Sequence, residues 1–233
     1  MKVLLFGATG MVGQGVLIEC LRAADVSLVQ SIGRTALDQQ DAKLRDVVHR
    51  DLLDYSAIES QLEGFDACFF CLGVTSAGKT EADYAHLTYD ITLAAANTLA
   101  RLNPQMTFVY VSGAGTDSTE QGRSMWARVK GRTENALLKL PFKAAYMFRP
   151  GVIQPLHGVR SKTSSYQILY TLTRPLLPLL RALLPATILT TEIMGQAMLA
   201  VARRGAAKPV LPRSPPRARW GGWVCRVRRR GRE

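Results

Sequence analysis

Residues 1–13, MKVLLFGATGMVG, decide how the rest of the chain is interpreted. An apolar run ends at Phe6, glycines stand at positions 7, 10 and 13, and a helical pattern follows. In such a strand–turn–helix unit Gly7 permits the tight turn, Gly10 lets a pyrophosphate approach the backbone, and Gly13 lets helix and strand pack closely. The start of the helix offers unpaired N–H groups and a positive dipole end to the phosphates. The predicted contacts of a dinucleotide are therefore Gly7, Ala8, Thr9, Gly10, Met11, Val12 and Gly13.

Apolar strand candidates alternate with helical patterns along the first 150 residues, as expected of a parallel sheet with crossover helices. The predicted strands are Lys2–Phe6, Ser27–Ile32, Asp46–His49, Ala67–Cys71, Thr107–Val111 and Ala144–Phe148. The predicted helices are Met11–Arg22, Tyr55–Leu62, Asp83–Leu102 and Ser124–Leu140. The fold class is therefore α/β: a Rossmann-type, doubly wound parallel sheet with a small C-terminal helical substrate region.

The pattern changes after Arg149-Pro150-Gly151. An apolar helical segment interrupted by prolines, Ser164–Leu184, precedes a last predicted helix at Thr191–Ala200. We predict one domain over residues 1–207, in which 151–207 form a helical substrate or lid part. Arginines and prolines leave Ser164–Leu184 short of the roughly 20 apolar residues that a membrane span needs. A lid, an association face in an oligomer and a peripheral membrane contact stay open as interpretations.

The net charge of +12 is concentrated in the last 26 residues. Residues 208–233 hold nine Lys and Arg against one acidic residue, whereas the other 207 hold 21 basic and 17 acidic residues. The body of the protein is therefore close to ordinary in charge, and no specific nucleic-acid partner is predicted. Three interpretations of the tail stay open: natural disorder, a shifted reading frame in GC-rich coding DNA, and a basic arm that binds nucleic acid or an anionic membrane surface.

Four cysteines bear on location and metal binding. Cys68 and Cys71 form a C-x-x-C within a predicted strand, and no second Cys/His pair is suitably spaced for zinc. We therefore predict core packing and no metal site. The apolar start stops at Phe6, too short for the hydrophobic region of an export signal. Reduced thiols and a cytoplasmic location are the resulting expectations.

The ends of the next strands indicate which dinucleotide is bound. An acidic residue after the second strand would accept hydrogen bonds from the ribose hydroxyl of NAD, but Arg34 and Thr35 follow this strand. A guanidinium there suits the 2′-phosphate of NADP(H), so NADP(H) is predicted over NAD(H). A solvated surface arginine is the alternative. Further strand-end contacts are predicted at Asp51, Leu52, Cys71, Leu72 and Gly73.

These residues resemble the short-chain dehydrogenase/reductase superfamily, above all its atypical, NmrA-like and Tat-interacting-protein-like members of epimerase/dehydratase type. The resemblance runs from Met1 to about Ala207. It is carried by GATGMVG, the Gly33-Arg34-Thr35 run, Asp51-Leu52, Val111-Ser112-Gly113, the segment Trp126–Lys130 and Arg149-Pro150-Gly151.

The resemblance implies a strand-end Ser that polarises the substrate, and a Tyr four residues before a Lys as acid/base, with the Lys holding the nicotinamide ribose. Ser112 and Lys130 match, but Trp126 stands at the Tyr position. An indole N–H donates a hydrogen bond but does not cycle a proton near neutral pH. Other candidate acid/base residues are Tyr84, Tyr89, Tyr110 and His157.

Two functions remain open. The first is an NADP(H)-dependent oxidoreductase, or a related epimerase or dehydratase, acting on a small carbonyl or hydroxyl compound. The second is a non-catalytic regulator that senses NADP(H) and binds a protein partner. Ser112 and Lys130 favour the first, and Trp126 favours the second.

Overall fold

Buried apolar runs form a seven-stranded, fully parallel sheet of order β3-β2-β1-β4-β5-β6-β9. Its strands are β1 Lys2–Phe6, β2 Leu28–Gly33, β3 Leu44–Val48, β4 Ala67–Phe70, β5 Thr107–Val111, β6 Ala144–Phe148 and β9 Val210–Leu211. The central strands are mostly buried and apolar because helices cover both faces of a parallel sheet. The structure is a computed structural model that describes residues 1–154 and 188–211.

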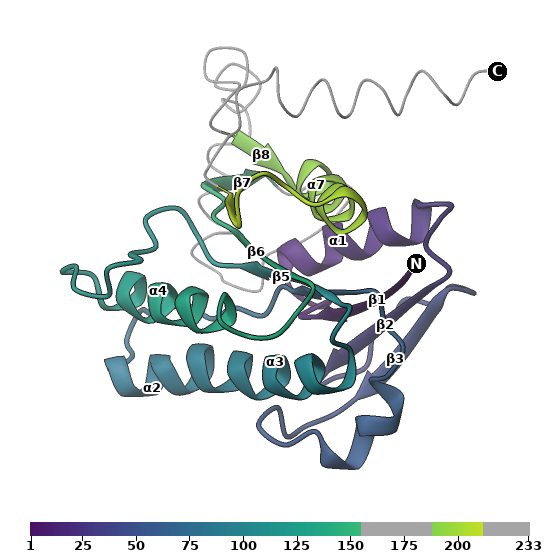
Figure 1. The fold of residues 1–233 in the computed structure, drawn as a ribbon, viewed down its shortest axis with the longest axis horizontal. Helices are drawn as coiled ribbons and strands as arrows, with labels where there is room; N and C mark the ends of the chain where they lie inside the picture. Colours follow the sequence, from purple (N-terminus) through teal and green to yellow (C-terminus); the bar gives the residue numbers. More distant parts are fainter. Residues whose placement is uncertain (155–187, 212–233) are drawn as a thin grey trace.

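Helices cover the two faces of the sheet in separate layers (Figure 1). Helices α1 Met11–Arg22 and α7 Thr191–Arg204 lie on one face. On the other lie η1 Ser56–Gln61, α2 Glu81–Ala85, η2 His86–Asp90, α3 Ile91–Leu102 and α4 Met125–Leu137. Two further short strands, β7 Val152–Gln154 and β8 Ile188–Thr190, pair with each other in parallel. The strand order confirms the predicted doubly wound fold.

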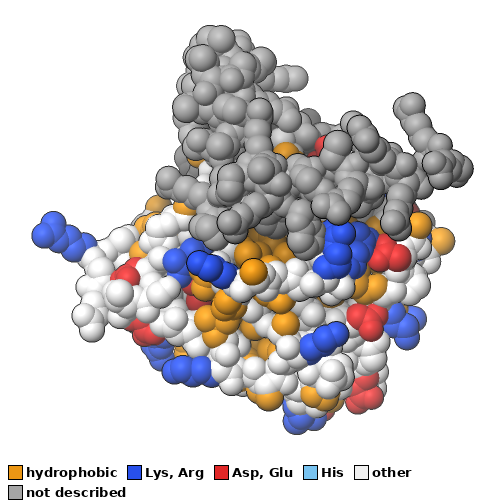
Figure 2. Space-filling model, turned by 45° about the horizontal axis from the view of Figure 1, so that its top comes forward, with side chains coloured by type: hydrophobic (Ala, Val, Ile, Leu, Met, Phe, Trp, Pro, Cys, Tyr) orange, Lys and Arg blue, Asp and Glu red, His pale blue; other side chains and the backbone are white. Residues whose placement is uncertain are grey.

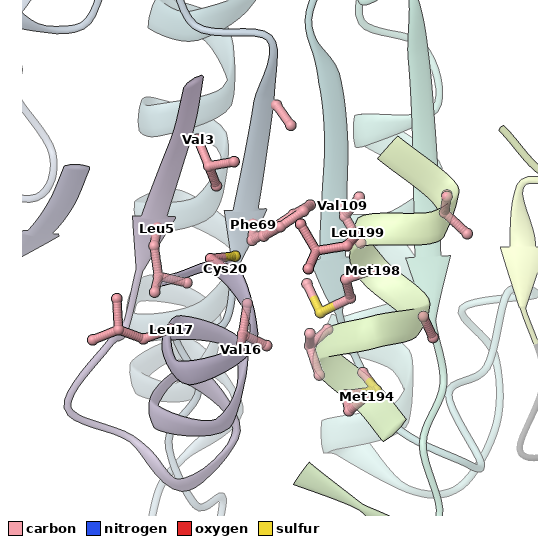
Figure 3. Packing of buried hydrophobic residues seen from close by; sticks show 14 of the residues in the cluster. Val3, Leu5, Val16, Leu17, Cys20, Phe69, Val109, Met194, Met198 and Leu199 are labelled. Carbon is pink, nitrogen blue, oxygen red and sulfur yellow. The ribbon is translucent and has the colours of Figure 1, made fainter. Parts of the chain in front are cut away.

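The last described helix belongs to the main core. Met194 and Met198 of α7 pack with Val16 and Cys20 of α1 against the sheet (Figure 3). The two helices approach closely because small residues face each other. A Cβ added at Gly15 would lie 2.5 Å from the Cβ of Thr191. Helix α7 thus packs, together with α1, on the face of the sheet that includes β1 and β5.

Several element boundaries differ from the prediction. The predicted helix Tyr55–Leu62 is the 3₁₀-helix η1, in keeping with buried residues three apart at Tyr55 and Ile58. The predicted helix Asp83–Leu102 begins earlier, because Thr80 caps α2 by accepting from the Asp83 N–H, and it contains a π-helical turn at η2. The segment Ser164–Leu184, His157 and the tail after Leu211 lie outside the described residues.

No helix joins β2 to β3, and ten residues, 34–43, make this parallel crossover. The loop is held down where the Leu37 N–H donates to Asp46 Oδ2 of β3 at 2.8 Å. Because the loop starts at the carboxyl end of β2, it places residues 34 and 35 at the edge of the sheet where the glycine turn also lies. In open parallel sheets, ligands bind at this edge.

Candidate dinucleotide and catalytic site

The glycine turn forms an uncapped helix start. Gly7 has a φ of +79°, and the Gly10 N–H donates to the Gly7 carbonyl at 2.9 Å. Gly10 is the N-cap residue of α1, which has neither a side-chain cap nor an acidic residue in its first turn. The first N–H groups of a helix lack partners within the helix. This turn therefore presents backbone donors and positive potential that fit a pyrophosphate.

Close packing requires two of these glycines. A Cβ at Gly7 would lie 2.8 Å from the backbone nitrogen of Leu72, so the turn touches the loop after β4. A Cβ at Gly13 would lie 2.1 Å from the carbonyl oxygen of Gly7, which leaves no room for a side chain where α1 meets the turn. The structure therefore brings the predicted contacts at residues 7–13 next to those at Cys71 and Leu72.

The ends of β2 and β3 carry the residues predicted to contact the adenosine half. Arg34 and Thr35 are exposed after β2, and Arg34 makes no ion pair within the described part of the chain. Asp51 is exposed, and its carboxylate accepts from the Leu53 N–H at 2.9 Å. Leu52 is buried in the core beneath this edge.

Sequence reasoning missed Arg50, which is exposed after β3. Strands β2 and β3 end side by side, since the His49 N–H donates to the Gly33 carbonyl at 2.8 Å. Two arginines therefore follow neighbouring strand ends at this edge. The sequence could have shown this, because Arg50 follows the third predicted strand as Arg34 follows the second, and neighbouring parallel strands end at the same edge.

The loop after β4 contains another pattern that sequence reasoning missed. Residues 73–80, GVTSAGKT, match the G-x-x-x-x-G-K-T spacing of a phosphate-binding loop. In the structure, however, the Thr80 hydroxyl donates to Asp83 Oδ2 at 2.7 Å, and Glu81 and Asp83 occupy the first helical turn. Carboxylates at a helix start repel phosphate. The arrangement is that of a helix cap and does not fit a nucleoside triphosphate.

Ser112, directly after β5, belongs to a buried polar network. Its Oγ lies 2.5 Å from Glu134 Oε1 and 3.1 Å from the Phe148 carbonyl oxygen. Glu134 is fully buried and forms an ion pair with Arg149, whose guanidinium also donates to Ser118 Oγ at 2.5 Å. Glu134 and its contact with Ser112 were missed in the sequence, although Glu134 lies one helical turn after Lys130.

Lys130 lies against the same strand end. Its Nζ donates to the backbone carbonyl of Ser112 at 2.5 Å. Burial lowers the pKa of Lys130 to about 8, while the Glu134 charge acts in the opposite direction. An amine in this range exchanges protons near neutral pH.

Trp126, one helical turn before Lys130, is half-buried beside the turn that follows β5. A Cβ added at Gly115 would lie 3.3 Å from the indole Cη2. Of the other candidate acid/base residues, Tyr84 and Tyr110 are buried, and desolvation raises the pKa of both phenols. The ring of Tyr89 lies 4.1 Å beneath the Arg132 guanidinium.

The cysteines that the structure describes lie within the fold. Cys20 and Cys68 are buried core residues, Cys71 is half-buried, and all three are free thiols. Burial raises the pKa of Cys20 to about 12, which opposes thiolate chemistry. Residues 1–154 and 188–211 contain no group of three side chains suited to hold a metal ion.

Two surface properties bear on partners. On the face shown in Figure 2, basic and acidic side chains are interspersed over the described residues. Among the helices of residues 1–154 and 188–211, none has the length and apolar character to cross a membrane.

Comparison with known proteins bears on the family of the chain. No family model matches the chain. It is 30% identical over 159 residues to the protein fmp52, mitochondrial, of Emericella nidulans, covering 65% of this chain and 66% of that one. It is 28% identical over 155 residues to the protein HTATIP2 of Rattus norvegicus, covering 65% of this chain and 62% of the relative. The chain belongs to the atypical short-chain dehydrogenase/reductases.

Solved short-chain dehydrogenase/reductases share the fold. An oxidoreductase of this family from Burkholderia thailandensis superposes with a TM-score of 0.63 at 17% identity, covering 96% of this chain and 97% of that one. Uronate dehydrogenase from Agrobacterium tumefaciens gives 0.64 at 17% identity, covering 91% and 76%. These findings confirm the predicted resemblance and fold class.

The expected cytoplasmic location is wrong by the same comparison. The FMP52 relatives of Scheffersomyces stipitis, Emericella nidulans and Eremothecium gossypii are named as mitochondrial proteins. The inference from the short apolar start failed because a residue pattern that excludes an export signal does not distinguish the compartments inside a cell.

Proposed function

We propose that this atypical short-chain dehydrogenase/reductase is an NADP(H)-binding oxidoreductase, or a close epimerase or dehydratase relative, that acts on a small carbonyl or hydroxyl compound. The observation that carries the proposal is the uncapped start of α1 beside the Gly7 turn, packed against the loop after β4. Family membership and fold support the coarser reading of an NAD(P)-binding oxidoreductase.

Different residues of the chain would bind different parts of the dinucleotide. Backbone N–H groups of residues 7–13 would bind the pyrophosphate, and Asp51 with Leu52 would border the adenine. Cys71, Leu72 and Gly73 would border a ribose, and Lys130 would hold the nicotinamide ribose. The nicotinamide supplies the hydride chemistry when it is bound.

The preference for NADP(H) rests on charge at the ends of β2 and β3. Arg34 and Arg50 are exposed there, and the four residues after Gly33 include no acid. A guanidinium binds a phosphate with two parallel hydrogen bonds, whereas NAD(H) offers only a ribose hydroxyl at this position. Thr35 adds a hydroxyl donor beside Arg34.

The test compares Arg34→Ala with Arg45→Ala, which removes an exposed arginine at the other end of β3. We expect Arg34→Ala to weaken NADPH binding by about 10- to 150-fold, since a hydrogen bond to a charged group contributes about 1.5–3 kcal/mol. NADH binding should stay within about twofold, and Arg45→Ala should change neither. Equal losses for NADPH and NADH would contradict the ribose-phosphate role.

A second candidate function rests on Trp126. With an indole at the position of the acid/base, the protein would bind NADP(H) and signal through a protein partner without turnover. The discriminating result is tight NADPH binding together with no reduction of small aldehydes, ketones and quinones.

A further inference from the structure

We propose that Lys130 is the proton donor and acceptor of this site, and that Ser112 meets the substrate as a hydrogen-bond acceptor. The inference rests on the oxidoreductase function proposed above. It assigns Lys130 a second task besides holding ribose, and it reverses the direction of the Ser112 hydrogen bond that the family resemblance implies.

The direction of the Ser112 hydrogen bond follows from counting protons. A serine hydroxyl has one proton, and the two groups of residues 1–154 and 188–211 that pair with Oγ, Glu134 Oε1 and the Phe148 carbonyl, are acceptors. The carboxylate at 2.5 Å takes this proton, because charge-assisted hydrogen bonds are shorter and stronger than neutral ones. Only a lone pair of Oγ remains for a ligand. Ser112 can therefore accept from a substrate hydroxyl but has no proton for a substrate carbonyl.

The negative charge that acts on Lys130, that of Glu134, is paired with Arg149. Arg149 Nε lies 3.1 Å from both carboxylate oxygens of Glu134, and its Nη donates to Glu134 as well. Lys130 itself donates to the uncharged carbonyl of Ser112 and has no ion pair within residues 1–154 and 188–211. A half-buried amine with a carbonyl as its partner has little to hold its proton.

The other elements packed against α4 do not restore that charge. Glu81 of α2 is paired with Arg128. Tyr84 of α2 and Tyr110 of β5 are buried phenols whose pKa is raised by desolvation, so both stay neutral. Glu134 is the one carboxylate among these groups that acts on Lys130, and it only partly offsets the burial that lowers the Lys130 pKa to about 8.

Among the residues that the structure describes at the end of β5, geometry leaves Lys130 as the proton carrier. Trp126 occupies the acid/base position and offers a donor that does not titrate near neutral pH. In reduction, the Lys130 ammonium would give its proton to the substrate oxygen, which breaks one N–H bond, while the carbonyl carbon gains the hydride that bound NADPH supplies as it is oxidised to NADP⁺. One O–H and one C–H bond form, the carbonyl π bond is lost, and water returns a proton to the amine. The new hydroxyl can then donate to Ser112 Oγ. In oxidation the neutral amine takes the hydroxyl proton.

The first test needs no substrate or cofactor. The full chain is labelled with ¹³C-lysine, and the Lys130 resonance is assigned by its absence in Lys130→Arg. We expect a titration midpoint near pH 8, and a lower midpoint in Glu134→Gln because the offsetting charge is removed. A midpoint near the reference value of about 10.4 would overturn the proposal whatever the activity.

The second test uses turnover of small aldehydes and ketones with NADPH. Lys130→Arg keeps a cation and donors for ribose but does not titrate, so the rate should fall at least about 100-fold while NADPH binding stays within a few-fold. Lys130→Ala should regain activity with added methylamine, which a merely structural lysine would not allow. The matched control is Lys139→Arg, on an exposed residue after α4, with unchanged rates.

The outcomes separate this inference from the proposed function. No NADPH binding by the wild-type chain would refute the proposed function, and the lysine titration alone would then decide the proton-carrying state of Lys130. Binding with a wild-type rate in Lys130→Arg would overturn the lysine role and leave the oxidoreductase standing. Binding without any turnover in the wild-type chain would overturn the lysine role and favour the sensor.

Discussion

Replacing Gly13 by alanine should separate helix packing from ligand binding in the glycine turn. The new Cβ would lie 2.1 Å from the Gly7 carbonyl oxygen and 2.7 Å from the Gly7 carbonyl carbon. Both atoms are backbone, so neither can swing aside. A Cβ contact under 3.0 Å is essentially never seen, which means that α1 must move away from the turn by about 1 Å.

The size of the effect follows from two opposing contributions. Overpacking in a tight core costs about 1–3 kcal/mol, and the rigid neighbour places this case at the upper end. Alanine in a helix interior recovers about 1 kcal/mol relative to glycine. The net loss of about 2 kcal/mol should lower Tm by about 4–8 °C in a chain of this size. Thermal unfolding of the chain without ligand, followed by circular dichroism, measures it.

Gly10→Ala is the matched control. Gly10 has an extended backbone with φ −83° and ψ 161°, and its added Cβ would lie 3.3 Å from the nearest atom, the Gly7 carbonyl oxygen. Its Tm should therefore stay within about 2 °C of the wild-type value, helped by a less flexible unfolded chain. NADPH binding should nevertheless weaken about tenfold or more, because the methyl group blocks the approach of the pyrophosphate. The reasoning is wrong if Gly13→Ala melts like the wild type or Gly10→Ala binds NADPH normally.

Three further predictions concern the network at the end of β5. Lys130→Met should stabilise the protein by about 2–3 kcal/mol at pH 7. The Lys130 pKa is lowered from 10.5 to about 8, and at about 1.4 kcal/mol per pKa unit this corresponds to about 3.5 kcal/mol, which solvent screening of the half-buried amine reduces. Below pH 8 Lys130 is charged in both the folded and the unfolded chain, so the full cost of burying the charged amine lowers the stability of the wild type. This cost falls as the pH rises toward 10.4, and denaturant unfolding should show no gain in stability for the variant above that pH. Arg149→Met should cost about 3–5 kcal/mol in urea unfolding, because it leaves a buried carboxylate unpaired. The control is Arg101→Met, which breaks a surface ion pair and should lower the free energy of unfolding by less than about 1 kcal/mol. Similar losses of stability in Arg149→Met and Arg101→Met would argue against the buried network. Trp126→Tyr should raise or create NADPH-dependent reduction of generic carbonyls by adding a second proton donor, and an unchanged rate would show that this position takes no part in proton transfer.

Much of the fold was predictable because strands buried on both faces are continuous apolar runs. Lys2–Phe6 and Thr107–Val111 were placed without error for this reason. The short strands β7, β8 and β9 were missed because two or three residues give no periodicity to detect. The 3₁₀ form of η1 was missed because buried positions three and four apart fit an α-helix almost as well.

The site was predictable only where it is local in sequence. The glycine turn, Ser112 and Lys130 stand in short motifs that can be recognised in isolation. The contact of Glu134 with Ser112 spans 22 residues and its ion pair with Arg149 spans 15, so both depend on how α4 packs beside β5 and β6. Arg149 was noted as part of a motif, but only the structure gives it a partner.

The central claim, that the glycine turn binds NADP(H), is tested most directly by calorimetric titration of the full chain with NADPH and, separately, with NADH. We expect micromolar binding of NADPH and binding of NADH that is at least about tenfold weaker, which corresponds to about 1.4 kcal/mol or more. Heat of binding for neither nucleotide would contradict the account, because an uncapped helix start beside Gly7 would then serve only the packing of α1 on the sheet.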